Sequence, residues 1–269
     1  EYVEQIRRDG YCVVEGVIGA DDVDRVRDDA IRVTHEDKRY QPALGGIAVA
    51  QDLINSSQVF APFLVSPPLI AVIKALLGPL PRVNSASALV SYPSNEQGDW
   101  HTDWPYSDEF SEFMPTPYPD MTMHLSTLWM LTPFNSVTGG TRIIPGSHRC
   151  GDSFADGLET EVRDSVQNWG IEPEAVPCVV VETEPGDIVV FWHNTKHAAF
   201  GGSQRRRMYT MNFYEHVPDD RLKEFQDALA HEGRFWIDRI HGEAMLRTAG
   251  PQRMVHLQQV RENDTHLAD

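Results

Sequence analysis

A histidine and an aspartate stand one residue apart at His101 and Asp103, inside the stretch GDWHTDWPYSDEF (98–110). In an extended chain, residues i and i+2 point to the same side, so these two side chains can present a nitrogen and an oxygen to one point. Two histidines and one carboxylate on one face of an ion form the site of non-haem Fe(II) oxygenases, which leaves coordination positions open. A second histidine from elsewhere in the chain is therefore expected to complete a metal site.

The chain has 11 histidines, and His197 is the preferred partner because of its surroundings. It ends the segment PGDIVVFWHNTKH, in which a tight turn leads into an apolar strand. His193 lies four residues earlier and could pair with His197 on a helix, but the β-branched residues before it argue against a helix. We predict His197 as the ligand and His193 as its neighbour.

The elements that must position these residues form a β-rich region between 82 and 216. Short apolar runs there are separated by Pro-Gly and Gly-Gly turns, a pattern typical of an antiparallel sandwich or barrel. We expect one domain, 1–269, whose core is all-β with helical flanks.

Helices are expected on both sides of that core. The N-terminal helices should lie within 20–78, and in SPPLIAVIKALLGPLP the Ser66 side chain can cap a helix that Gly78 ends. A C-terminal helical tail, 219–269, carries an apolar stripe that should pack on the barrel or on a second subunit. Its apolar residues are Leu222, Phe225, Leu229, Phe235 and Trp236.

Composition excludes several classes of protein. A formal net charge of −17 argues against a nucleic-acid partner, which would require a basic face. The three cysteines form no CxxC pair and predict neither a disulfide framework nor a zinc site. No apolar stretch is long enough to span a membrane, and the first residues do not read as a signal peptide, so we expect a cytoplasmic protein without a membrane partner. Oligomeric state cannot be predicted from these features.

Four segments together resemble the phytanoyl-CoA dioxygenase family of Fe(II)- and 2-oxoglutarate-dependent oxygenases. They are RRDGYCVVEGVIGADDVDRV (7–26), DWHTD (99–103), GGTRIIPGSHR (139–149) and PGDIVVFWHNTKHAAFGGSQRRRMYTMNFY (185–214). HxD alone is weak evidence, whereas HxD, PGSH, a distal histidine and an arginine in this order are specific. The resemblance implies a double-stranded β-helix, also called a jelly roll or cupin-like barrel, with iron held by His101, Asp103 and His197.

The resemblance also gives a role to the arginine run at 205–207. The far carboxylate of 2-oxoglutarate requires a planar, permanently charged partner, which arginine provides as a two-pronged donor. Alternation along a strand separates Arg206 from Arg205 and Arg207, but both faces are partly apolar, so periodicity does not choose between them. The family pattern favours Arg206, with Arg207 as the alternative.

Other residues near the expected site have weaker roles. Some relatives place glutamine two residues before the first ligand to hold the cosubstrate, where this chain has Asp99, whose charge would repel a carboxylate. Thr141 is a substitute candidate for that contact. Trp104 and Tyr106 follow the ligands and could contact the substrate or pack at the rim. GGTRIIPGSHR is interpreted as structural.

These observations predict a dioxygenase that uses Fe(II), 2-oxoglutarate and O₂ to oxidise, most simply to hydroxylate, a small organic metabolite. The retained Asp103 argues against halogenation, because halogenating relatives replace this carboxylate. Phytanoyl-CoA itself is disfavoured by the lack of a further basic cluster for its phosphates. Two alternatives remain open: a cupin-like isomerase or hydrolase that does not use 2-oxoglutarate, and a ligand-binding jelly roll without catalysis.

Overall fold

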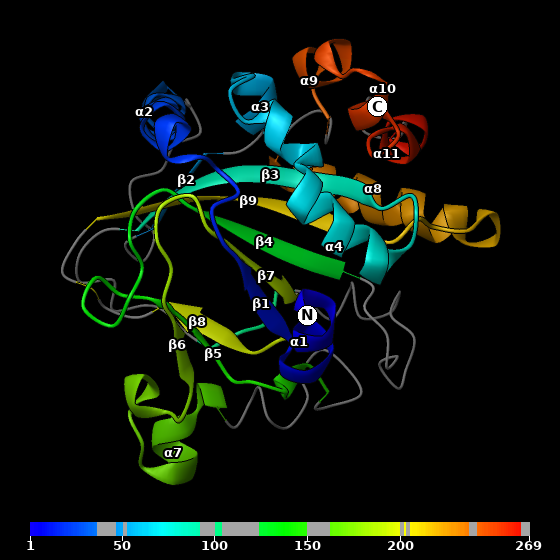
Figure 1. Ribbon diagram of the computed structural model, residues 1–269. Helices are drawn as coiled ribbons and strands as arrows, with labels where there is room; N and C mark the ends of the chain where they lie inside the picture. Colours follow the sequence, from blue (N-terminus) through cyan, green and yellow to red (C-terminus); the bar gives the residue numbers. More distant parts are fainter. Residues whose placement is uncertain are drawn as a thin grey trace.

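Two antiparallel sheets form the centre of the molecule in the computed structural model (Figure 1). The structure describes residues 1–36, 47–50, 53–91, 100–103, 124–149, 162–199, 202, 205–236 and 241–264. The larger sheet has the strand order β1-β7-β4-β9-β3-β2, and the smaller sheet has the order β6-β5-β8. This arrangement agrees with the predicted double-stranded β-helix.

Every pairing within the two sheets is antiparallel. The strands of the larger sheet are β1 (Tyr11–Val14), β2 (Ile47–Ala50), β3 (Arg82–Ser91), β4 (His124–Met130), β7 (Ile188–Trp192) and β9 (Arg206–Tyr214). Those of the smaller sheet are β5 (Thr141–Ile143), β6 (Val179–Val181) and β8 (His197–Ala199). Because sequence-distant strands are neighbours in both sheets, the order of strands follows from non-local pairing rather than from any local motif.

Helices cover the outer face of the larger sheet (Figure 1). The helices longer than one turn are α1 (Tyr2–Asp9), α2 (Ala20–Glu36), α4 (Pro67–Leu77), α7 (Ser165–Trp169), α8 (Leu222–Trp236), α9 (Glu243–Thr248) and α11 (Gln258–Asn263). Short helices α3 (Leu53–Ser56) and α10 (Pro251–Met254) complete the set in the described part of the chain. Helix α7 is different, because it lies below β6 and away from the larger sheet (Figure 1). For the helices on the larger sheet, burial of apolar faces against the sheet is the main force holding the layer in place.

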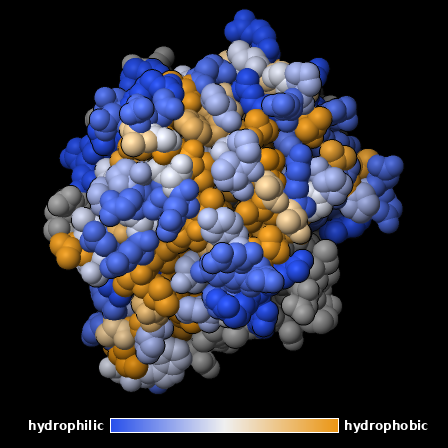
Figure 2. Space-filling view, viewed as in Figure 1, coloured by the Kyte–Doolittle hydropathy of each residue, from blue (hydrophilic) through white to orange (hydrophobic). Residues whose placement is uncertain are grey.

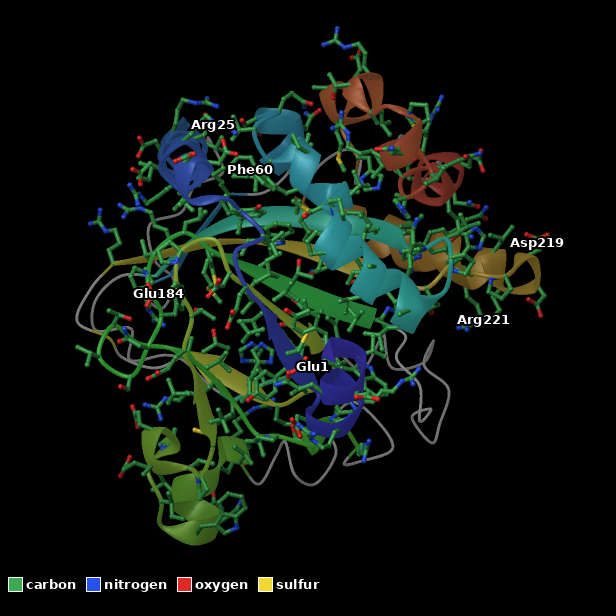
Figure 3. All side chains as sticks on the ribbon, in the orientation of Figure 1. Glu1, Arg25, Phe60, Glu184, Asp219 and Arg221 are labelled. Carbon is green, nitrogen blue, oxygen red and sulfur yellow. The ribbon has the colours of Figure 1, made fainter. Side chains whose placement is uncertain are left out.

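Alternation along β9 separates the two sides of the larger sheet. Tyr209, Met211 and Phe213 point to the helices and join the main apolar core. Phe60, labelled in Figure 3, lies edge-on to the Tyr209 ring at 5.1 Å between centroids. Met208 lies on the opposite side, against a second cluster that includes Phe134 and Ile143. Because this cluster joins residues of both sheets, it marks the interior of the barrel.

Helices α2 and α4 form within the predicted range 20–78, whereas α1 lies before it and was not predicted. The expected cap of α4 also needs correction. Ser66 occupies the N-cap of α4, but its side chain makes no capping hydrogen bond. Pro67 at the first helical position already lacks an N–H, so the need for a side-chain cap is reduced. Gly78 ends the helix with a φ of 88°, a value that favours glycine. Hydrophilic side chains cover the surface over α2 (Figure 2), whereas Val26 and Val33 of this helix are buried.

The C-terminal tail packs on the barrel through α8 and α11. Phe225 and Leu229 are buried together with Val217 and Val260. The Arg82 guanidinium of β3 lies 4.4 Å from the centroid of the Phe225 ring, which joins the tail to the larger sheet. Asp219 and Arg221, before α8, lie at the outer end of this helix (Figure 3). The side chains of Phe235 and Trp236 lie outside the described part of the structure.

None of the helices in the described part of the chain is long and apolar enough to cross a lipid bilayer.

Candidate metal centre

Backbone pairing brings the HxD segment against the segment that carries the distal histidine. His101 and His197 exchange two backbone hydrogen bonds, N to O, each of 3.0 Å. The Asp103 amide donates to the carbonyl of His193, also at 3.0 Å. His197 begins β8, where it pairs directly with Ile143 of the barrel interior. The register of these segments therefore directs the side chains of His101, Asp103 and His197 to one place.

The three side chains meet at distances suited to a metal ion. Asp103 Oδ1 lies 3.4 Å from His197 Nε2 and 3.8 Å from His101 Nε2. One ligand atom from each residue lies within 4.8 Å of the others, and no other such cluster of three or more potential ligands is found among the described residues. His193 does not belong to the cluster.

A second hydrogen bond orients the His197 ring. Its Nδ1 donates to the carbonyl of Thr195 at 3.0 Å, an assignment that follows because a carbonyl can only accept. The lone pair of the neutral imidazole is then on Nε2, which faces Asp103. The Phe191 ring packs against His197 with 4.7 Å between centroids. Such a partner on the far nitrogen is usual for a histidine that binds metal.

The charge state of Asp103 also suits a cation. Burial by itself would raise the pKa of Asp103, but His197 beside it, with smaller effects of His193 and His101, holds the pKa well below its usual range. The group is therefore a carboxylate near neutral pH. Two neutral imidazoles and one carboxylate form the donor set typical of non-haem Fe(II), so the residues present fit this metal.

Arg206 lies inside the barrel, at the start of β9. Its side chain is only 1% exposed, and Nη1 donates to the Gly139 carbonyl at 2.7 Å. Its Cζ lies 5.6 Å from the centroid of the Phe134 ring in the interior cluster. Burial lowers the pKa of Arg206, but a guanidinium stays charged at any physiological pH. A buried cation of this kind is suited to an anionic ligand.

The neighbouring arginines and Thr141 occupy different surroundings. Arg205 is exposed and Arg207 is partly exposed, so only Arg206 of the run is buried. Thr141 is 4% exposed and lies two residues before Ile143 on β5, on the same face of that strand. It pairs with Ala199, two residues after His197. Thr141 therefore shares the interior face with the distal histidine.

Several predicted residues cannot be located in the structure. Asp99, Trp104 and Tyr106 lie outside the described residues. Trp100 is described and is 1% exposed, with its indole N–H donating to the Pro173 carbonyl at 3.0 Å. It therefore packs as a core residue beside the metal ligands.

A cluster of polar side chains at one end of β4, β7 and β9 was not predicted from the sequence. His124 and His193 have ring centroids 6.1 Å apart, and Tyr214 contacts both rings. His124 Nδ1 lies 3.5 Å from Glu215 Oε2. The polar residues at alternate positions of β4, His124 and Ser126, are the signal that could have indicated a polar interior at this end.

Comparisons with known proteins agree with the fold. The family model described as Phytanoyl-CoA dioxygenase (PhyH) matches residues 6–208. No curated protein sequence matches the chain.

Solved structures with the same fold include three enzymes. The epimerase SnoN, in complex with Fe3+, alpha ketoglutarate and nogalamycin RO, is 21% identical, with a TM-score of 0.59 over 80% of this chain and 82% of that one. HygX from Streptomyces hygroscopicus, with nickel and 2-oxoglutarate bound, is 16% identical, with a TM-score of 0.63 over 80% and 86%. The carbocyclase SnoK from nogalamycin biosynthesis is 19% identical, with a TM-score of 0.60 over 83% and 89%. At these identities the similarity demonstrates a shared fold.

Proposed function

The chain belongs to the phytanoyl-CoA dioxygenase (PhyH) family and is an Fe(II)- and 2-oxoglutarate-dependent oxygenase, and from this premise we propose that it hydroxylates a C–H bond of a small organic molecule. The balanced reaction takes substrate, O₂ and 2-oxoglutarate to hydroxylated product, succinate and CO₂. The observation that carries the proposal is the convergence of His101, Asp103 and His197 in a barrel that also buries Arg206.

His101, Asp103 and His197 are assigned as the three protein ligands of the metal. When bound, iron would supply the oxidising chemistry in which one atom of O₂ enters the substrate and the other enters succinate. The chain's own contribution is to fix the three donor atoms. Thr195 holds the His197 ring through Nδ1, and the low pKa of Asp103 keeps its carboxylate ionised.

Arg206 is assigned to the far carboxylate of 2-oxoglutarate. Its guanidinium is buried, charged and oriented by the Gly139 carbonyl, so it can bind a carboxylate with little loss of side-chain entropy. Thr141, on the interior face of β5, is a candidate for a further hydrogen bond to the cosubstrate.

A small substrate is favoured over a nucleotide-bearing one. Of the basic run at 205–207, Arg206 is directed into the barrel, so it is not available for the phosphates of coenzyme A at the surface. Trp104 and Tyr106 remain proposed substrate contacts because they follow the ligands directly in the sequence. We further propose that residues 1–269 act as one catalytic domain.

The proposal is tested by incubating the Fe(II)-loaded protein with 2-oxoglutarate, ¹⁸O₂ and a pool of metabolites. Hydroxylation predicts a product that is heavier by one ¹⁸O atom, formed in a 1:1 ratio with succinate. A product lighter by two hydrogens, or one of unchanged mass, would replace hydroxylation by desaturation, cyclisation or epimerisation. The fold is compatible with such outcomes, since SnoN is an epimerase and SnoK a carbocyclase. The Asp103→Ala variant serves as the control for background oxidation.

A further inference from the structure

His193 is a buried polar residue to which the proposed reaction gives no role. Its side chain is 1% exposed, yet within the described structure neither ring nitrogen has a hydrogen-bond partner. Leaving a buried polar atom unpaired costs about 1–3 kcal/mol, so such a group in a folded protein requires an explanation.

The position of His193 links it to one metal ligand in particular. Its carbonyl accepts the hydrogen bond from the Asp103 amide, so the two residues lie side by side on paired segments. The charges of the two side chains also influence each other: Asp103 favours the protonated form of His193, and His193 favours the ionised form of Asp103. The charges of two described carboxylates, Asp103 and Glu215, interact with the ring, and Asp103 is the one whose backbone is hydrogen-bonded to His193.

Asn212 also interacts with the His193 ring. Ser126 Oγ donates to Asn212 Oδ1 at 3.1 Å, and the interaction of Asn212 with His193 raises the pKa of the ring. A neutral imidazole carries one ring N–H. Because neither ring nitrogen of His193 has a hydrogen-bond partner within the described structure, this N–H can be donated to a further acceptor.

The outer carboxylate oxygen of Asp103 can accept a hydrogen bond from this N–H. Asp103 Oδ1 approaches both histidine Nε2 atoms, so Oδ1 is assigned as the oxygen on the metal side. A facial site needs the carboxylate to bind through one oxygen, so that the remaining positions stay open. Ligating carboxylates are commonly fixed by a hydrogen bond to their outer oxygen.

We propose that His193 is a positioning residue for the metal site, with its ring N–H donating to the outer carboxylate oxygen of Asp103 when metal binds. The two side chains are not in direct hydrogen-bond contact in the structure, so the bond forms through a small rotation or through one bridging water. This bond then joins the segment that follows β7 to the metal ligand. This inference rests on the metal site assigned under the proposed function.

The test measures metal affinity and does not depend on turnover. Co(II) alone is titrated into the metal-free protein and followed by its visible d–d absorption. His193→Phe, which keeps the ring volume but removes both nitrogens, should weaken Co(II) binding by about 10- to 100-fold and change the band shape. His193→Gln, which can still donate, should restore most of the affinity.

His124→Phe is the matched control, because His124 stacks on His193 but makes no backbone link to Asp103. It should change Co(II) affinity by no more than about 3-fold. Circular dichroism of each variant checks that it is folded. If His193→Phe does not fold, the proposal is tested on the wild-type protein by ¹⁵N-histidine NMR. Addition of Zn(II) should then produce a slowly exchanging, downfield signal from the ring N–H of His193.

Equal Co(II) affinity of His193→Phe and the wild type would overturn the proposal. The absence of a slowly exchanging His193 ring N–H in the NMR spectrum of the Zn(II)-loaded wild type would also overturn it. His193 would then be a substrate contact or a packing residue. Failure of the proposed reaction is distinguishable. A wild type that binds Co(II) in a His193-dependent manner but forms no oxygenated product refutes hydroxylation and leaves the positioning role intact. A wild type that binds no Co(II) refutes the metal site and the positioning role together.

Discussion

Asp103 supplies the only negative charge among the three assigned ligands, and this makes it the most informative residue to change. Asp103→Ala should abolish 2-oxoglutarate-dependent succinate formation, because two neutral imidazoles hold a divalent ion far less tightly than two imidazoles and a carboxylate. Asp103→Glu should impair turnover, since the added methylene moves the carboxylate out of its facial position. Succinate release is the measurement, with the exposed Asp24→Ala as control. Near wild-type turnover of Asp103→Ala would refute the ligand assignment.

Arg206 is the second residue with a strong expected effect. Arg206→Gln removes a charge-assisted pair and leaves the far carboxylate of 2-oxoglutarate partly desolvated, at a cost of about 2–4 kcal/mol. The dissociation constant of 2-oxoglutarate from the Fe(II)-loaded protein should rise by about 30- to 1000-fold, as measured by anaerobic calorimetry. Arg207→Gln is the matched control, because Arg207 points to the other face of β9 and is partly exposed. A large effect of Arg207→Gln with a small effect of Arg206→Gln would exchange the two roles.

At the scale of residues, the sequence predicts which types can bind metal but not all of their neighbours. The HxD spacing and the β-branched run before His197 are local signals, and they are sufficient to choose three residues that the structure brings together. Which of Arg206 and Arg207 faces the barrel interior could not be read from periodicity, because both faces of β9 carry apolar residues and the pairing of β9 with β3 and β4 defines the interior. The stacking of His124 on His193 depends on the register between β4 and β7, which no local pattern encodes.

At the scale of elements, the barrel is held from outside by helices and by the tail. Phe225 of α8 is 5% exposed and covers the Arg82 guanidinium at the start of β3. Phe225→Ala should lower the free energy of unfolding by about 3–5 kcal/mol, because it opens a cavity and removes the ring from the cation. Urea denaturation is the measurement. Leu80→Ala, at an exposed position, should change it by no more than about 0.5 kcal/mol. Equal stability of Phe225→Ala and the wild type would show that the tail does not support the barrel.

The sequence predicts these elements better than it predicts their arrangement. Apolar runs separated by turns correspond to β3, β4, β7 and β9, and the apolar stripe of the tail corresponds to α8. The expected Ser66 side-chain cap is wrong, because the proline at the start of α4 reduces the number of amides that need one. Strand β2 and the order of the larger sheet could not be predicted, since pairing between distant segments depends on the whole core.

At the scale of the whole molecule, metal binding should stabilise the fold, because the ligands come from segments that are distant in sequence and meet only in the native state. A metal at 100 times its dissociation constant adds about 2.7 kcal/mol to the free energy of unfolding. For a chain of this size that corresponds to a rise in Tm of roughly 5–10 °C. Differential scanning calorimetry with Zn(II), before and after chelation by EDTA, is the measurement. Asp103→Ala should show little of this rise, and a full rise in that variant would indicate metal binding elsewhere.

The central claim is that one barrel holds the metal and 2-oxoglutarate together, and the most direct measurement is an anaerobic titration of 2-oxoglutarate into the Fe(II)-loaded protein, followed by visible absorption. Chelation of iron by the keto acid gives a charge-transfer band that neither component shows alone. The account predicts a saturable band with one 2-oxoglutarate per chain, absent in Asp103→Ala and requiring a higher concentration in Arg206→Gln. A wild-type protein that binds Fe(II) but shows no band at any concentration of 2-oxoglutarate would contradict it.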